Sequence, residues 1–348
     1  MRPRARDHGW QVGHWPTGPG NAVTDVAGVR VGHATLRGGA RDDESGMACT
    51  GVTILDVGGP GRWRRRWSAG SHVVNGFGQL TGRDVIEAQG ALTGPIFLTG
   101  TRSLGRVYDA AIAWALADDP DAARADIPIP VVGECDDGYL SCPDAVCDFD
   151  QVAEAAGALA SGPVPEGGVG AGAGMHLFGY KGGIGTASRR VRTSTALPVY
   201  TVGVLLLTNF GNPEDMRLPP GAGAAAPPGA TPRPGSCIGV VVTDAPLHPG
   251  QLSRLAARAG FGLIRAGSVG RTGSGEILLA VSTATAIDPA VPLMDGRFLT
   301  DRSEGEPDTV SQLYAATAEA SEEAVWNALV AGTTTVGHDG HVLPGYYP

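Results

Sequence analysis

The chain has 348 residues, 42% of them hydrophobic, and a formal net charge of −9 at pH 7. This composition is typical of a globular protein long enough to bury a sizeable core. The acidic balance argues against a nucleic-acid partner or an anionic membrane surface. No apolar run approaches the roughly 18 residues that a membrane-spanning helix needs. Residues 1–20 contain arginines but no apolar run, so they predict no secretory signal.

The five cysteines are odd in number and unevenly spaced, which is not the pattern of a disulfide framework in a chain of this length. They favour a reducing compartment, and we expect a cytoplasmic location. Cys135, Cys142 and Cys147 lie close together, but their spacing is not CxxC and no histidine is near. Small thiols in the interior are therefore a better interpretation than a zinc site.

Short strands and helices alternate along the first third of the chain. The apolar pattern predicts strands at 22–31, 51–57 and 94–99, a short helix at 84–90 and an amphipathic helix at 101–116. The run RWRRRW at 62–67 is both basic and aromatic. Because short charge runs are usually solvated, we expect a loop or a contact between subunits there.

A glycine-rich segment, 166–190, separates a predicted strand at 127–132 and helix at 150–160 from an apolar strand at 200–207. Its spacing does not match GxGxxG, so we expect close backbone packing and no bound phosphate. Residues 214–235 are rich in Pro, Ala and Gly and predict an exposed, flexible loop. The remaining predicted elements are strands at 236–243 and 276–282 and helices at 249–266 and 309–331.

Ser236 and Cys237 follow this loop directly and begin an apolar strand. HExxH and GxSxG are absent, and the eight histidines show no triad spacing. A serine without a histidine can use its own α-amino group as the base once the preceding peptide bond is broken. Gly235 and the loop fit such a self-cleaved bond; an ordinary entry from a loop into a strand is the alternative. Cys237 is predicted to point away from Ser236 as a buried hydrophobic residue.

Six segments between residue 20 and about 284 resemble the DmpA-type aminopeptidases, the family of β-peptidyl aminopeptidases and L-aminopeptidase/D-esterases also called peptidase family P1. They are GNAVTDVAGVRVGHATL (20–36), VNGFGQLTG (74–82), KGGIGTASR (181–189), LLTNFG (206–211), GSCIGVVVTDAPL (235–247) and RTGSGEILLAVSTA (271–284). The resemblance implies an α/β fold, a four-layer αββα sandwich shared with ornithine acetyltransferases. Its layout is that of Ntn hydrolases with a different connectivity.

The resemblance also implies one catalytic domain, 1–348, that cleaves itself into an α chain, 1–235, and a β chain, 236–348. Such enzymes assemble into homotetramers of αβ units and use neither a metal nor an organic cofactor. They release N-terminal residues from short peptides, amides and esters with a free amino terminus. Whether an L-residue, D-alanine or a β-amino acid is preferred stays open at this stage.

Ser236 corresponds to the nucleophile of the family. Ser274 and Glu276 match a pair that forms hydrogen bonds near the nucleophile and its amino group. Asn209, and the N–H of Gly275, correspond to donors for the oxyanion.

Glu134 corresponds to a carboxylate that pairs with the ammonium group of the substrate. After it the chain has DGYLSC where many members have DGYLND, so Tyr139 is not assigned to the pocket. Two alternatives stay open: an acyltransferase of the ornithine-acetyltransferase type, and a non-catalytic scaffold that kept the fold. Ser236 argues against the first, whose nucleophile is threonine, and the complete set of site residues argues against the second.

Overall fold

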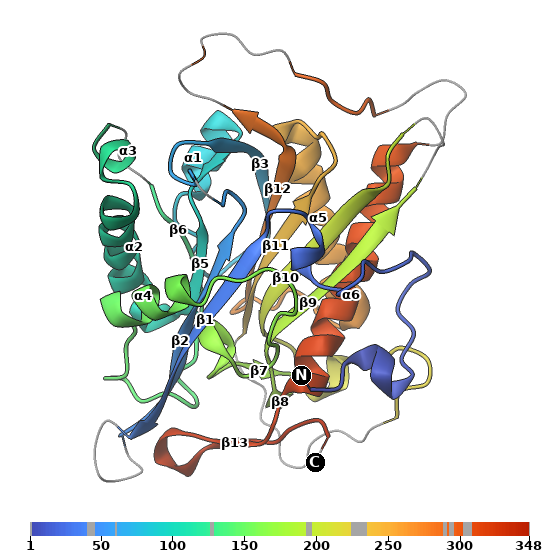
Figure 1. The fold of residues 1–348 in the computed structure, drawn as a ribbon. Helices are drawn as coiled ribbons and strands as arrows, with labels where there is room; N and C mark the ends of the chain where they lie inside the picture. The colour runs from blue at the N-terminus through green and yellow to red at the C-terminus, as the bar shows by residue number, and fades with distance from the viewer. Residues whose placement is uncertain are drawn as a thin grey trace.

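Two β-sheets face each other at the centre of the protein, and helices cover the outer face of each sheet (Figure 1). The structure is a computed structural model. It describes residues 2–39, 46–59, 61–125, 129–192, 197–223, 235–287, 291, 296–301 and 308–347. The two termini lie at the same end of the molecule (Figure 1).

The smaller sheet has the strand order β1-β2-β5-β6. Its strands are β1 (Arg30–Gly39), β2 (Met47–Asp56), β5 (Ile96–Gly100) and β6 (Val131–Cys135). The helices on its side are α2 (Leu104–Asp118), α3 (Pro120–Ala125) and α4 (Phe149–Gly157).

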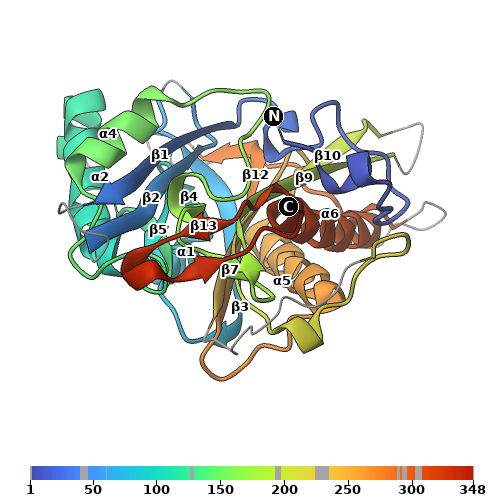
Figure 2. The same ribbon diagram turned by 90° about the horizontal axis from the view of Figure 1, so that it is seen from below.

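The larger sheet has the order β4-β3-β12-β11-β10-β9. Its strands are β3 (Arg66–Gly76), β4 (Ala91–Thr93), β9 (Gly183–Val191), β10 (Tyr200–Asn209), β11 (Ser236–Thr243) and β12 (Gly275–Ile287). Helices α5 (Pro249–Ala266) and α6 (Thr309–Ala331) lie side by side on its outer face (Figure 2). Shorter elements are α1 (Arg83–Gln89), β7 (His176–Leu177), β8 (Tyr180–Lys181), β13 (Thr335–Val336) and β14 (Val342–Leu343).

Alternate side chains of the central strands fill two different cores. On β10, Val204 and Leu206 pack with the residues of α5 and α6, while Leu205 and Leu207 pack between the sheets. This two-residue period is what a strand buried on both faces produces. The predicted αββα sandwich is therefore confirmed.

The predicted strand at 22–31 is wrong over most of its length, because β1 begins only at Arg30. Asp25 accepts hydrogen bonds from the backbone N–H groups of Gly20 (2.8 Å) and Ala22 (3.1 Å). These bonds stabilise a 3-10 turn at Val23–Asp25 instead of a strand.

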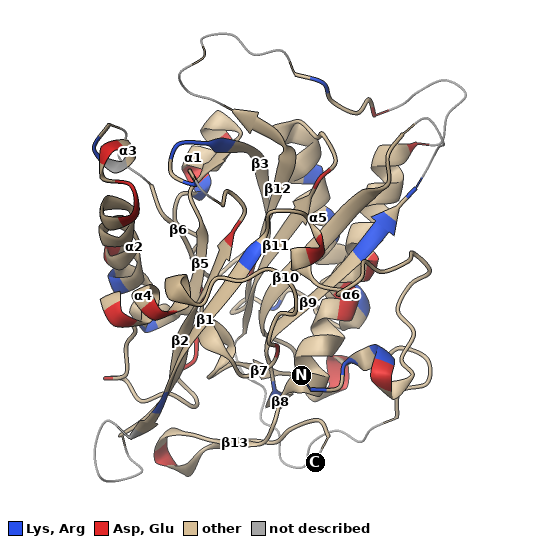
Figure 3. Ribbon diagram, viewed as in Figure 1, with Lys and Arg blue, Asp and Glu red and all other residues tan. Residues whose placement is uncertain are grey.

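The run 62–67 is only in part the predicted loop: residues 62–65 lie outside helices and strands, and Arg64 and Arg65 are exposed. Trp63 and Trp67 are buried, and Arg62 pairs with the carboxylates of Asp56 and Asp118. Arg66 begins strand β3, which the sequence did not predict. Elsewhere Figure 3 shows Lys and Arg interspersed with Asp and Glu along helices and loops.

The glycine-rich segment contains strand β9 and packs as closely as predicted. A Cβ atom at Gly185 would lie 2.9 Å from the carbonyl carbon of Ala324 on α6. Of the predicted loop 214–235, residues 214–223 and Gly235 are described, whereas 224–234 lie outside the described residues. Within the described residues no helix is both long and apolar enough to cross a membrane.

Candidate active site

The ends of four neighbouring strands bring three of the predicted site residues into one row. Asn209 of β10 is opposite Ser236 of β11, Ser236 is opposite Gly275 of β12, and Gly275 is opposite Gly76 of β3. Because β11 and β12 are parallel, the N–H of Gly275 donates to the carbonyl oxygen of Gly235 at 3.2 Å. The predicted oxyanion donor thus contacts the carbonyl of the bond predicted to break.

Ser236 is the first residue of β11 and is only 5% exposed. Its Oγ has no nitrogen or oxygen partner among the described residues, and the buried thiol of Cys135 lies beside it. Ile238, on the same face of the strand, packs between the two sheets, while Cys237 packs toward α5 and α6. Burial raises the pKa of the Cys237 thiol well above its ordinary value, which keeps it protonated. The prediction that Cys237 is a buried hydrophobic residue is confirmed.

Ser274 and Glu276 form a buried hydrogen-bonded pair beside this row. The Ser274 hydroxyl donates to a carboxylate oxygen of Glu276, which is 1% exposed. Burial raises the pKa of the Glu276 carboxyl, and the hydrogen bond from Ser274 opposes that rise. The structure therefore brings these two residues together, and the hydrogen bond from Ser274 lowers the pKa of Glu276 against the effect of burial.

The side-chain amide of Asn209 is held in one orientation by two backbone groups. Its Oδ1 accepts from the N–H of His176 at 3.0 Å, and its Nδ2 donates to the carbonyl of Asp136 at 2.9 Å. An amide nitrogen carries two hydrogens, so one of them is left for a further acceptor.

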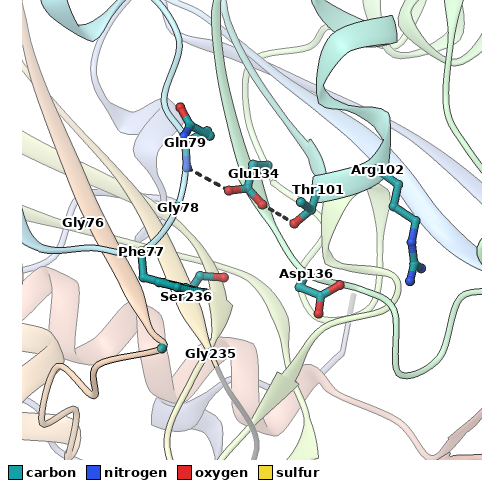
Figure 4. A pocket seen from close by; sticks show the side chains of 11 residues that line it. Gly76, Phe77, Gly78, Gln79, Thr101, Arg102, Glu134, Asp136, Gly235 and Ser236 are labelled. Atoms are coloured by element: carbon teal, nitrogen blue, oxygen red, sulfur yellow. Dashed lines mark hydrogen bonds between the residues drawn. The ribbon is translucent and has the colours of Figure 1, made fainter.

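Glu134 lies on β6, in the other sheet, yet it lines the same cavity of about 570 Å³ as Ser236 (Figure 4). One carboxylate oxygen accepts from the N–H of Gln79 at 2.8 Å, and the other accepts from the hydroxyl of Thr101. Both bonds come from neutral donors, so the buried carboxylate has acceptor capacity left for a cation.

The profile of peptidase family S58 matches residues 21–343. The chain belongs to this family. The beta-peptidyl aminopeptidase BapA of Sphingosinicella microcystinivorans is 39% identical to it, over 98% of this chain and 89% of that protein.

Two solved structures are similar to this family S58 member over 99% of its length and 95% of theirs. The beta-aminopeptidase of a Burkholderia species has a TM-score of 0.87 and 38% identity. The L-aminopeptidase D-Ala-esterase/amidase of Ochrobactrum anthropi, a variant of the Ntn-hydrolase fold, has a TM-score of 0.88 and 33% identity. The predicted DmpA-type family is confirmed, and with it the predicted enzyme class, an aminopeptidase hydrolase.

The sequence did not predict Gln79 and Thr101 as site residues of this S58 chain. The segment VNGFGQLTG contains Gln79 and was a usable signal, whereas no motif marks Thr101. Tyr139 stacks on His341 with ring centroids 4.3 Å apart and does not line the cavity of Ser236.

The cysteines of this S58 chain, Cys135, Cys142 and Cys147 among them, are buried and unpaired. The described part of the chain places no group of three or more His, Cys, Asp or Glu side chains suitably for a metal ion.

Proposed function

We propose that this family S58 enzyme cleaves its own Gly235–Ser236 bond and then uses Ser236 to release N-terminal residues from short peptides, amides and esters. The main support for this proposal is that the Ser236 hydroxyl and the Glu134 carboxylate line the same cavity. A nucleophile and an ammonium-binding group at one cavity are what an aminopeptidase needs.

In the proposed self-cleavage, Ser236 Oγ attacks the carbonyl carbon of Gly235, and the acyl group moves from the nitrogen of Ser236 to its oxygen. The proton of the hydroxyl goes to that nitrogen, which becomes the free α-amine. Water then hydrolyses the ester and leaves a carboxylate on Gly235. The Gly275 N–H, which already donates to the Gly235 oxygen, would stabilise the charge that develops there.

In the proposed peptidase reaction, the new α-amine takes the proton of Ser236 Oγ as this oxygen attacks the substrate carbonyl. An α-amine with a pKa of about 7.7–8.0 is well matched to this task near neutrality. Departure of Gly235 frees the Gly275 N–H, which binds the oxyanion together with the second N–H of Asn209 Nδ2. The α-amine passes the proton to the leaving amine. Water then hydrolyses the ester on Ser236 and releases the N-terminal residue as a free amino acid.

Replacing Gly235 by alanine is expected to slow self-cleavage and to lower the free energy of unfolding by about 1–3 kcal/mol. The added Cβ would lie 2.6 Å from the carbonyl oxygen of Asn209 and 2.8 Å from Cα of Phe210. A gel time course of the fraction cleaved, with thermal unfolding, measures both effects. Gly223→Ala is the control, since its Cβ would have no atom within 4 Å; equal behaviour of the two variants would contradict the prediction.

Replacing Ser274 by alanine is expected to move the acid limb of the pH–kcat profile to higher pH. The Ser274 hydroxyl lowers the pKa of Glu276, which burial raises, so its removal lets the pKa rise further. We propose that Glu276 acts as a carboxylate, and its protonation would then begin at a higher pH. Ser282→Ala on β12, the strand of Glu276, is the control, because the Ser282 hydroxyl donates to the carbonyl of Ala245 and not to Glu276. An unmoved limb in Ser274→Ala would rule out this role.

We further propose β-aminoacyl compounds as the preferred substrates. Two relatives support this preference by name, a beta-peptidyl aminopeptidase at 39% identity and a beta-aminopeptidase at 38%. Hydrolysis of H-β-Ala, H-L-Ala and H-D-Ala p-nitroanilides tests the proposal. The β-alanyl compound should give the highest kcat/KM; turnover of none of the three would contradict the aminopeptidase function itself.

We propose a single catalytic domain whose two chains stay together, because the proposed site takes Asn209 and Glu134 from the α chain and Ser236, Ser274 and Gly275 from the β chain. Five buried, unpaired cysteines support the proposed reducing cytoplasm. The homotetramer implied by the family resemblance stays a prediction, which sedimentation or light scattering would measure.

A further inference from the structure

Lys181 is the last residue of β8 and is fully buried, which is rare for a cationic side chain. Its Nζ donates to three backbone carbonyls, those of Gly172, Met175 and Gly182, each at 2.8 Å. Burial lowers the pKa of Lys181 to about 7, but donation to three carbonyls requires the three hydrogens of the ammonium group, so the hydrogen bonds are those of the charged form. The three hydrogen bonds offset part of the free energy that is lost when the ammonium group is removed from water. A buried cation with this remaining penalty is a candidate for a functional role.

One peptide group links Lys181 to the site. The carbonyl of Met175 accepts from Lys181 Nζ and also from the N–H of Gly182 at 2.9 Å. The N–H of the same peptide group, on His176, donates to Asn209 Oδ1 at 3.0 Å. Lys181 and Asn209 therefore hold the two ends of the Met175–His176 peptide.

We propose that Lys181 is a positioning residue for the oxyanion site and acts through the Met175–His176 peptide on the amide of Asn209. The inference rests on the proposed function, in which Asn209 binds the oxyanion. The His176 N–H can donate only to the oxygen of the Asn209 amide, and the Asp136 carbonyl can accept only from its nitrogen, so together they prevent a flip of the amide. A cation on the Met175 carbonyl polarises the peptide and strengthens its N–H as a donor.

A purely structural role would be the packing of the glycine-rich segment around Lys181. The two roles differ in one respect: the positioning role depends on Asn209, and the structural role does not. A double-mutant cycle with Lys181→Met and Asn209→Ala separates them, with kcat expressed per cleaved active site so that unprocessed protein does not count.

Lys181→Met is expected to lower kcat by at least about tenfold, a part of the loss that follows removal of an oxyanion donor, and to change KM little. In the Asn209→Ala background the same substitution should change kcat by no more than about twofold. Arg189→Met is the matched control, a second fully buried cation that is bonded to Glu323 at 2.6 Å. Its effect on kcat should be equal in both backgrounds.

Equal losses for Lys181→Met in the two backgrounds would overturn the positioning role and leave the proposed function standing. Full kcat in Asn209→Ala alone would refute the oxyanion role of Asn209, and the role of Lys181 with it. If Lys181→Met does not fold, Lys181→Gln, which keeps two N–H donors without the charge, takes its place in the same cycle with the same two outcomes.

Discussion

Ser236→Ala is expected to remain one uncleaved chain of 348 residues and to lose kcat/KM by at least about 10⁴-fold, the scale seen when a hydrolase loses its nucleophile. The alanine lacks both the oxygen that attacks Gly235 and the oxygen that attacks the substrate. No histidine lies in the described row of site residues to activate a water in its place. A denaturing gel and an aminoacyl p-nitroanilide assay on the same sample measure both losses.

Cys237→Ala is the matched control for this variant. Cys237 is adjacent in sequence but packs toward α5 and α6, so the change leaves a small cavity in the core and keeps the nucleophile. Cleavage and activity should both persist in Cys237→Ala. Two chains and retained turnover in Ser236→Ala would show that another residue carries the reaction.

Glu134→Gln is expected to lower kcat/KM for free-amino substrates by about 10–150-fold, mainly through KM. The change removes one hydrogen bond between charged groups, and such bonds contribute about 1.5–3 kcal/mol. Self-cleavage should proceed normally, since the precursor bond presents no ammonium group. Steady-state kinetics with H-β-Ala p-nitroanilide and a gel of the processed fraction test the two parts separately.

Asp136→Asn provides the comparison for Glu134→Gln. Asp136 is a second carboxylate that lines the cavity, and one of its oxygens accepts from the N–H of Gly138 at 3.0 Å. We expect a smaller rise in KM from this variant. An equal rise in KM in both variants would mean that the ammonium group is bound by the overall negative charge of the cavity and not by Glu134 in particular. Loss of self-cleavage in Glu134→Gln would contradict the assignment of Glu134 to substrate binding alone.

The elements with the clearest sequence patterns were predicted to the residue. Strand β11 is a β-branched run after a glycine, and α5 and α6 carry apolar stripes with the period of a helix. β3 was missed because its first residues, Arg66 and Trp67, do not belong to an apolar, β-branched run, and the burial of Trp67 arises only from packing between the two sheets. β9 was missed because glycine has low strand propensity, and the need for glycine arises from the backbone of α6.

The site residues likewise divide into those that the local sequence indicates and those that it does not. Local chemistry alone pointed to Ser236, since a small residue and a loop precede a nucleophile that has no histidine. Asn209, Glu134 and the Ser274–Glu276 pair came from the family resemblance, and strand register then explains why Asn209 and Gly275 flank Ser236. Thr101 contacts Glu134, and the proposed link from Lys181 reaches Asn209 through the N–H of His176; each of these bonds joins residues 33 positions apart, which no motif in the sequence expresses.

N-terminal sequencing of the purified wild-type protein, combined with its intact mass, tests the central claim most directly. The account predicts two chains, one of which begins Ser236-Cys237-Ile238, in a preparation that hydrolyses aminoacyl p-nitroanilides. A fully active preparation that contains only the intact chain would contradict it, because Ser236 would then have no α-amine to act as its base.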